Sequence, residues 1–365
     1  MNKKYKEIPI FFASDNNYAP YLVVALKSLL ANASKDYFYK IHVLTSNMSD
    51  DNKLVLLREL TFNSSIEFIN LSKETEAIKD KFHLRDYYSI DTYYRFFIAD
   101  LFPEYDKVIY LDSDIIVLGD ISDLYFYNIS NYLLGVVQEQ VMAHNEVFSD
   151  YVEKALGVKC KNYFNAGILL MNSKMFRICN IQAKFFKLME RFKFRVTQDE
   201  DYLNVICKDK VKYLDLGWNK MPYEETGFDD VGLQIIHYTL GWKPWHYENI
   251  RYEEYFWQYA AQTEYYEQLQ NELKNYGEDK KQRDAQSYEN LKNMAIADTF
   301  DYNNYRNTIE REQKRKYLMR GLRTIIAFPG IRVVTRFIQA QGYKLLHAYT
   351  RFKRFAKNIT FKSVS

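Results

Sequence analysis

The sequence is poor in cysteine and glycine, and it lacks the glycine-rich loops that usually bind phosphate. Its 365 residues include three Cys, 12 Gly and 6 Pro. Cys160, Cys179 and Cys207 are odd in number and have no metal-ligand spacing, which favours free thiols in a reducing compartment over a disulfide framework. No Gly-x-Gly-x-x-Gly follows the first expected strand and no Gly-x-x-x-x-Gly-Lys occurs, so the usual dinucleotide-binding and P-loop signals are excluded.

Long apolar runs are also absent. No segment approaches the roughly 20 apolar residues of a membrane-spanning helix. The apolar stretch Ile8–Ala13 follows a basic start at Lys3 and Lys4, but it is too short for a signal peptide and ends at Ser14. We therefore interpret it as a first β-strand and expect a cytoplasmic protein.

A net charge of only +3 hides an uneven distribution of charge. From residue 303 to 365 there are 15 Lys and Arg but only two acidic residues, Glu310 and Glu312, so this tail carries +13 and residues 1–302 carry −10. Apolar residues interleave with these cations, and Pro329-Gly330 is expected to divide the tail into two helices. We favour a peripheral position on an anionic membrane, at the inner face of the cell membrane. A helical hairpin packed on the core and, less favoured, nucleic-acid binding are the alternatives.

Apolar strands alternate with helical patterns over the first 70 residues. The predicted elements are strands at Ile8–Asp15, Lys40–Thr45 and Ser65–Asn70, a helix beginning at Pro20 and another at Asp50–Leu60. This alternation is typical of an α/β fold with a doubly wound, mostly parallel, Rossmann-like sheet. We assign residues 1–257 to this α/β domain and residues 258–365 to a helical, basic C-terminal extension.

The run Lys107–Leu118 is apolar except for a carboxylate pair, Asp112 and Asp114. Within it, Val108–Leu111 has the pattern of a strand buried on both faces, so the acidic pair at its end emerges at the edge of the sheet where α/β proteins bind ligands. Two adjacent carboxylates stay ionised most easily with a cation between them, and Mg²⁺ or Mn²⁺ in such a site shares its other positions with phosphate oxygens. Asp-x-Asp alone is weak evidence, since residues 199–201 repeat it at a helix start, where carboxylates also serve as caps.

A histidine and a lysine follow another predicted strand. His237 ends the strand Leu233–His237 and opens a loop that contains Lys243. A neutral imidazole would complete an Asp–Asp–His site, although a histidine satisfied within the core is the plainer interpretation. Lys243 would neutralise phosphate as a point charge.

Two segments flank the Asp-x-Asp run. A helix is predicted before it, at Asp91–Asp100, with Phe97 and Leu101 in the core and Arg95 able to point toward the ligand crevice. A strand-like segment after it opens with Asn165-Ala166-Gly167, small residues that let another molecule approach the backbone closely.

Six motifs occur in a fixed order: Ala13-x-Asp15-x-Asn17-Tyr18, Tyr93-x-Arg95, Tyr110-Leu111-Asp112-Ser113-Asp114, Phe164-Asn165-Ala166-Gly167, Asp199-x-Asp201-x-Leu203-Asn204, and His237-Tyr238 followed by Lys243-Pro244-Trp245. Together they make residues 8–255 resemble glycosyltransferase family 8, the retaining GT-A fold enzymes that include bacterial lipopolysaccharide galactosyl- and glucosyltransferases. The resemblance implies a GT-A fold. It also implies transfer of a hexose, galactose or glucose, from a UDP-sugar donor to a glycan, glycolipid or glycoprotein acceptor.

The same resemblance implies roles for individual residues. Asp112, Asp114 and His237 would bind Mn²⁺ or Mg²⁺, which grips the diphosphate of the UDP-hexose, and Lys243 would reach the phosphates. The residues expected around the donor are Ala13, Asp15, Asn17 and Tyr18 at uracil and ribose, Ser113 within the Asp-x-Asp motif, and Arg95, Asn165, Ala166 and Asp199 at the sugar. The expected catalytic residues are Glu200, Asp199 and Arg95.

Glu200 departs from the family pattern, because the lipopolysaccharide enzymes usually have Gln at this position. Retention of configuration needs either a covalent nucleophile or front-face attack guided by the leaving phosphate, and an uncharged Gln favours the second. Glu200 leaves both open, since it would stabilise the positive anomeric centre by charge or act covalently.

Two other functions fit parts of the pattern. A metal-dependent phosphohydrolase with Asp112 as nucleophile also has Asp-x-Asp after an apolar strand, but Thr or Val is expected where Ile116 stands. A non-catalytic glycan-binding module would not need the aspartates, His237 and Lys243 together. Acceptor specificity is expected to lie in two variable loops, at Val141–Lys161 and Glu224–Gly232.

Overall fold

The computed structural model describes residues 5–76, 90–223 and 230–327. The chain divides into two compact units, Met1–Tyr305 and Arg306–Ser365. The domain boundary expected at residue 257 therefore falls inside the first unit.

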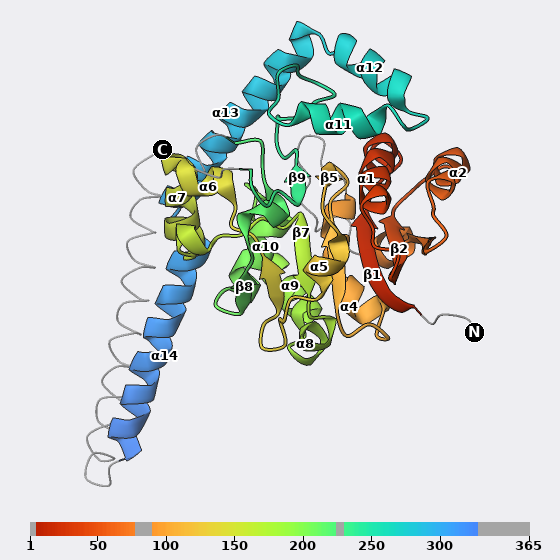
Figure 1. Ribbon diagram of the computed structural model, residues 1–365. Helices are drawn as coiled ribbons and strands as arrows, with labels where there is room; N and C mark the ends of the chain where they lie inside the picture. The colour runs from red at the N-terminus through yellow and green to blue at the C-terminus, as the bar shows by residue number, and fades with distance from the viewer. Residues whose placement is uncertain (1–4, 77–89, 224–229, 328–365) are drawn as a thin grey trace. The chain divides into compact units, whose positions relative to one another are not determined.

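Among the described residues, a seven-stranded sheet forms the centre of the first unit, in the order β3-β2-β1-β4-β7-β6-β8 (Figure 1). Its strands are β1 (Lys6–Ala13), β2 (Tyr37–Thr45), β3 (Ser64–Asn70), β4 (Val108–Leu111), β6 (Leu134–Val136), β7 (Ile168–Met171) and β8 (Val211–Tyr213). β1 pairs in parallel with β2 and β4, β2 with β3, and β6 with β8, while β7 runs antiparallel to β4 and β6. The predicted mostly parallel α/β sheet is confirmed.

The helices between the first strands begin where the sequence predicts. α1 (Ala19–Ala31) has Pro20 in its first turn, and most of its residues are buried. α2 (Asp50–Arg58) is capped by the Ser49 hydroxyl, which accepts a hydrogen bond from the Asn52 backbone N–H at 3.2 Å. The next helices are α3 (Ser72–Glu76), a 3₁₀ helix (Ile90–Phe96), α4 (Ile98–Leu101) and α5 (Ile121–Tyr125).

The helix predicted at Asp91–Asp100 is therefore largely 3₁₀. Phe97 is buried as expected, but Leu101 is 39% exposed, so its assignment to the core was wrong. In a 3₁₀ helix the residues i and i+3 share one face, and this places Thr92 and Arg95 together.

The strand predicted before the acidic pair, Val108–Leu111, is β4. β4 ends at Leu111, and β5 (Ile115–Val117) leaves the main sheet to pair antiparallel with β9 (Ile235–His237). Residues 112–114 connect the two sheets, so both carboxylates lie just past the end of β4, as predicted, and at the junction between the sheets. The pairing of β5 with β9 is what brings His237 opposite the Asp-x-Asp motif.

The segment Val141–Lys161, expected as an acceptor loop, is mainly helical. It contains most of α6 (Gln140–His144), then α7 (Glu146–Tyr151), a π-helical turn (Val152–Leu156) and the start of a 3₁₀ turn (Cys160–Asn162). Most of the other expected loop, residues 224–229 of 224–232, lies outside the described residues. Farther along are α8 (Ser173–Ile178), α9 (Ile181–Met189), α10 (Asp199–Cys207) and a 3₁₀ turn (Leu216–Asn219).

The first unit also contains α11 (Glu253–Ala260), which spans the predicted domain boundary, and two helices beyond it, α12 (Tyr266–Lys274) and α13 (Glu278–Phe300). α13 packs against α7, and its Tyr288 ring lies 6.1 Å from that of Phe148. α14 (Tyr305–Ala327) leads into the second unit, while Pro329-Gly330 and the second predicted tail helix lie outside the described residues. Within the described part of the chain, no helix is both long and apolar enough to cross a membrane.

Candidate active site

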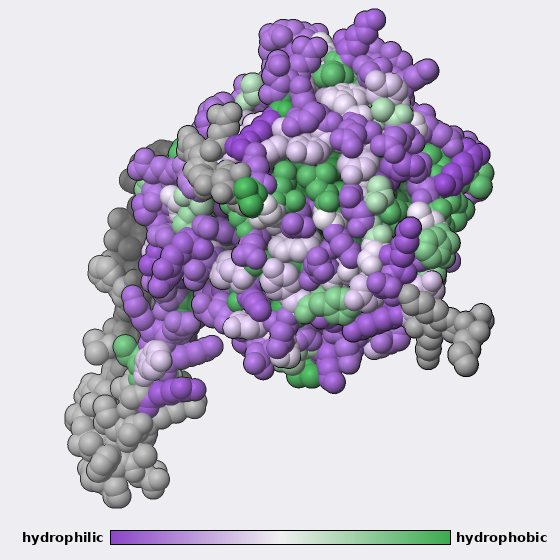
Figure 2. Space-filling model, in the orientation of Figure 1, coloured by the Kyte–Doolittle hydropathy of each residue, from purple (hydrophilic) through white to green (hydrophobic). Residues whose placement is uncertain are grey.

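One pocket gathers nearly all of the predicted site residues at the carboxyl ends of β1 and β4, where β7 begins. Those that line it are Ala13, Asp15, Tyr18, Arg95, Asp112, Ser113, Asp114, Asn165, Ala166, Asp199, Glu200, His237 and Lys243. The face seen in Figure 2 is mainly polar, with apolar side chains gathered over the region of β5 and β9. Segments far apart in the sequence therefore build a single site.

Asn17 is the exception among the predicted residues. It is exposed and does not line the pocket; its backbone N–H donates to Asp15 Oδ1 at 2.9 Å. The same oxygen accepts from the Tyr18 N–H at 3.0 Å, so the Asp15 carboxylate holds the turn that precedes α1.

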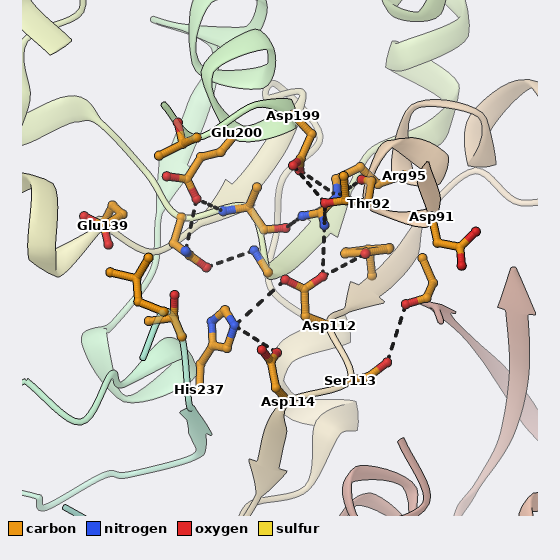
Figure 3. A pocket seen from close by; sticks show the side chains of 18 of the residues that line it. Asp91, Thr92, Arg95, Asp112, Ser113, Asp114, Glu139, Asp199, Glu200 and His237 are labelled. Carbon is orange, nitrogen blue, oxygen red and sulfur yellow. Dashed lines mark hydrogen bonds and ion pairs between the residues drawn. The ribbon is translucent and has the colours of Figure 1, made fainter. Parts of the chain in front are cut away.

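Asp112, Asp114 and His237 converge from β4, the following turn and β9 (Figure 3). One ligand atom from each residue lies within 4.8 Å of those from the other two. His237 Nε2 is 3.2 Å from Asp114 Oδ1 and 3.9 Å from Asp112 Oδ2. Two carboxylate oxygens and an imidazole nitrogen in this arrangement can share one cation.

The other oxygen of each carboxylate already has partners. Asp112 Oδ1 accepts from Arg95 Nη2 at 3.0 Å and from the Tyr110 hydroxyl at 2.8 Å, and Asp114 Oδ2 pairs with Lys243 Nζ. This leaves Asp112 Oδ2 and Asp114 Oδ1 directed at His237. These oxygen and nitrogen donors suit Mn²⁺ or Mg²⁺, so the residues fit the metal that the sequence predicts.

Asp114 is held in its ionised form. Burial alone would raise the pKa of this carboxyl, but Lys243 and His237 outweigh that effect and bring it well below its ordinary value. Lys243 is itself buried, and its ammonium also donates to the Tyr238 carbonyl oxygen at 2.5 Å. The predicted phosphate-binding lysine thus pairs with a predicted metal ligand.

Arg95 joins the two halves of the pocket. Its guanidinium donates to Asp112 Oδ1 on one side, lies 3.1 Å from Asp199 Oδ2 on the other, and also donates to the Ala166 carbonyl oxygen. It also lies 4.4 Å from the centre of the Tyr110 ring. Arg95 is therefore a buried bridge between carboxylates, as Figure 3 shows.

The acidic start of α10 supplies three carboxylates with different surroundings. Burial raises the pKa of Asp199 to about 6, although Arg95 acts to lower it. Glu200 Oε2 accepts from Asn165 Nδ2 at 3.0 Å and from the Ala166 N–H at 2.9 Å. Asp201 accepts hydrogen bonds from the hydroxyls of Tyr151 and Tyr163, each at 2.7 Å. Its role is therefore structural.

Glu139 is a pocket residue that sequence reasoning missed. It follows β6 and caps α6 by accepting from the Met142 N–H. Burial raises its pKa to about 7, and its charge helps to raise the pKa of Glu200, which burial already places well above the ordinary value. A glutamate close behind the short apolar run Leu133–Val137 is the signal that could have identified it.

Residues 9–249 match the family model described as glycosyl transferase family 8. The chain belongs to this family. A putative glycosyltransferase of Haemophilus influenzae is 29% identical over 245 residues, which cover 65% of this chain and 72% of the relative. The lipopolysaccharide 1,3-galactosyltransferase of Salmonella typhimurium is 32% identical over 167 residues, 42% of this chain and 49% of the relative.

Solved structures agree with the family assignment. The galactosyltransferase LgtC, in complex with donor and acceptor sugar analogues, is similar with a TM-score of 0.59 and 28% identity, covering 70% of this chain and 96% of that one. The bifunctional glycosyltransferase WbbM in its apo form has a TM-score of 0.64 and 27% identity, covering 73% of this chain and 52% of that one. The predicted GT-A fold is thereby confirmed, and membership of a glycosyltransferase family speaks against the phosphohydrolase and binding-module alternatives.

Proposed function

We propose that this family 8 glycosyltransferase is a retaining hexosyltransferase that moves galactose or glucose from a UDP-sugar to a glycan, glycolipid or glycoprotein acceptor. The observation that carries the proposal is the cluster of Asp112, Asp114 and His237 in the same pocket as Arg95 and Glu200. The names of the Salmonella galactosyltransferase and of LgtC support the choice of hexose.

Asp112, Asp114 and His237 would hold Mn²⁺ or Mg²⁺, which neutralises the negative charge of a diphosphate leaving group when bound. Lys243 adds a second positive charge, because its ammonium lies beside the Asp114 carboxylate. When a diphosphate enters, its oxygens compete with Asp114 for this ammonium, so Lys243 stabilises the charge that develops as the glycosyl bond breaks.

Ala13, Asp15 and Tyr18 line the pocket at the end of β1 and are assigned to the nucleoside of the donor. Asn17 is assigned no contact with the donor, because it is exposed and lies outside the pocket lining. The sugar is assigned to the opposite part, beside Asn165, Ala166 and the start of α10. Arg95 keeps Asp112 and Asp199 in fixed positions there, and this preorganises the site.

Glu200 would stabilise the positive charge that forms at the anomeric carbon. Its two hydrogen bonds, from Asn165 and Ala166, both reach Oε2 and hold the carboxyl in one orientation. The same carboxyl could attack the anomeric carbon covalently, whereas a purely electrostatic part fits front-face attack by the acceptor.

The test is a screen of UDP-galactose, UDP-glucose and UDP-N-acetylglucosamine for slow hydrolysis with Mn²⁺ and no acceptor. The matching binding measurement is thermal stabilisation, which we expect from UDP and Mn²⁺ together and not from UDP alone. Failure of every donor to react, with no stabilisation by UDP and Mn²⁺, would contradict the proposal. Product stereochemistry, read by NMR from the donor that reacts, tests retention.

A cytoplasmic protein peripheral to an anionic membrane remains our proposal for its location. The basic residues of α14 support it.

A further inference from the structure

Asn219 is a fully buried polar residue to which the sequence motifs assign no part. It ends the 3₁₀ turn Leu216–Asn219 and lies between two residues of the site. Its Oδ1 is 3.0 Å from His237 Nδ1, and its Nδ2 donates to Asn165 Oδ1 at 2.8 Å. Asn219 thus connects His237, a candidate metal ligand, to Asn165. Asn165 in turn donates to Glu200, the carboxyl assigned to the donor sugar.

The direction of these hydrogen bonds is fixed by the backbone. The Gly167 N–H donates to the Asn165 side chain at 2.9 Å, and because a backbone N–H can only donate, the atom it meets must be the oxygen Oδ1. The other end of the Asn165 amide is then Nδ2, which donates to Glu200 Oε2 at 3.0 Å. The Ala166 N–H also donates to that oxygen, at 2.9 Å.

The orientation of the Asn165 amide determines which atoms of Asn219 and His237 donate and which accept. Because Asn165 presents an oxygen, Asn219 must present its NH₂ group there and its carbonyl oxygen to the imidazole. A carbonyl oxygen only accepts, so His237 Nδ1 carries the hydrogen, and in the neutral imidazole Nε2 then keeps its lone pair. Nε2 is the atom that faces Asp112 and Asp114.

Without this constraint the imidazole has a competing arrangement. With the hydrogen on Nε2, the ring would donate to Asp114 Oδ1, which lies 3.2 Å away, and both groups would be lost as ligands. Asn219 opposes that arrangement by accepting from Nδ1. Metal-bound histidines commonly depend on such a partner for their second nitrogen.

We propose that Asn219 is a positioning residue that holds His237 in its metal-binding tautomer through a chain of hydrogen bonds, Glu200–Asn165–Asn219–His237. The inference rests on the metal site of the proposed function. It adds a residue outside the six motifs, and it links the carboxyl assigned to the sugar with the nitrogen assigned to the metal.

The test compares two substitutions of this residue. Asn219→Leu removes both hydrogen bonds, and we expect the dissociation constant for Mn²⁺, measured by electron paramagnetic resonance with UDP present, to rise about 10- to 100-fold. Asn219→Asp keeps an acceptor for the His237 Nδ1–H and should lose less affinity than Asn219→Leu. Imidazole ¹⁵N chemical shifts of His237 in the metal-free protein should show the Nδ1–H tautomer in the wild type and a mixture in Asn219→Leu.

Asn63→Leu is the matched control. Asn63 is a buried asparagine next to β3 that donates to the carbonyl oxygens of Ser34 and Tyr37 at 2.9 and 3.0 Å, so its loss should lower stability without changing Mn²⁺ affinity. Equal affinities and an unchanged tautomer in Asn219→Leu would overturn the inference, as would equal losses of affinity in Asn63→Leu. A wild-type protein that binds no Mn²⁺ with UDP would instead overturn the proposed metal site.

Discussion

A β-carbon added to Gly167 would stand only 2.3 Å from Cε1 of His237. The same β-carbon would be 2.7 Å from Asp112 Oδ2, so the start of β7 and the predicted metal site are packed against each other without space for a methyl group. The sequence suggested that small residues here admit another molecule. In the structure it is the chain's own His237 and Asp112 that approach the backbone.

Gly167→Ala should therefore displace two metal-ligand candidates. We expect turnover to fall by up to about 100-fold, because catalytic groups moved by about 1 Å lose this much. The measurement is kcat at saturating donor together with Mn²⁺ affinity. Gly277→Ala is the control, because nothing lies within 4 Å of a β-carbon there, and its activity should match the wild type. An active Gly167→Ala variant with normal Mn²⁺ affinity would contradict this packing argument.

The sequence motifs identified most of this site because each places a reactive or ligand-binding residue type next to a predicted strand or helix end. Asp112 and Asp114 follow an apolar strand and His237 ends one, and such residues collect at the edge of a sheet. Asn219 has no comparable signal, since its importance depends on a side chain 18 residues away and on another 54 residues away. Long-range hydrogen-bond partners of this kind cannot be read from local pattern.

Arg95→Met should destabilise the fold, because Asp112 and Asp199 would lose their shared buried cation. A buried charge left without its partner costs on the order of 3–5 kcal/mol of unfolding free energy. Urea unfolding without metal measures this loss. Arg58→Met removes an exposed pair with Glu264 and should have a much smaller effect. Similar losses in the two variants would show that Arg95 does not bridge buried carboxylates.

The strand and helix boundaries were harder to predict than the overall fold. β4 occupies the predicted range Val108–Leu111, but the sequence did not indicate that Ile115–Val117 would form a further strand, β5, in a second sheet. Two long-range hydrogen bonds hold the junction, from the Asp112 N–H to the Gly167 carbonyl at 2.8 Å and from the Tyr238 N–H to the Asp114 carbonyl at 2.9 Å. Periodicity detects burial and not the identity of the neighbouring strand, so this division was not visible in the sequence.

Glu139 should make stability depend on pH. Burial raises its pKa from 4.5 to about 7 in the folded protein, so folding favours the protonated form. The stabilisation is complete below about pH 4.5 and is lost as the pH rises through 7, a change on the order of 3 kcal/mol. Glu139→Gln, whose amide oxygen can still cap α6, should flatten this dependence in urea unfolding at pH 5 and pH 7.5. The exposed Glu248→Gln should leave the wild-type slope, and an equally steep slope in Glu139→Gln would refute the assignment.

Glu200→Gln separates the charge of this residue from its hydrogen bonds. The amide oxygen can still accept from Asn165 and Ala166, so Mn²⁺ affinity should remain normal. We expect kcat to fall on the order of 100-fold, since the variant cannot offer a negative charge to the anomeric centre. Burial raises the pKa of Glu200, so wild-type kcat should increase with pH as the carboxyl ionises, and this rise should be absent from the variant. Full kcat in Glu200→Gln would exclude both the electrostatic and the covalent role proposed for Glu200.

The basic part of α14 combines charge with exposed apolar side chains. Tyr317, Leu318 and Met319 are 74%, 69% and 51% exposed, and three exposed cations directly precede them, Lys314, Arg315 and Lys316. Surfaces of this composition bind anionic lipid headgroups through charge while their apolar groups enter the interface.

We expect the full chain to sediment with anionic phosphatidylglycerol liposomes and not with neutral ones. Changing residues 314–316 to Gln should weaken this binding about 100-fold, at ~1 kcal/mol for each of three cations. The matched control changes three exposed cations of α13, Lys280, Lys281 and Arg283, to Gln and should bind as the wild type does. Raising the salt concentration should weaken wild-type binding, because exposed charges are screened beyond about 10 Å at 0.1 M. Undiminished sedimentation of the α14 variant, or an equal loss in the α13 variant, would rule out this surface as the membrane contact.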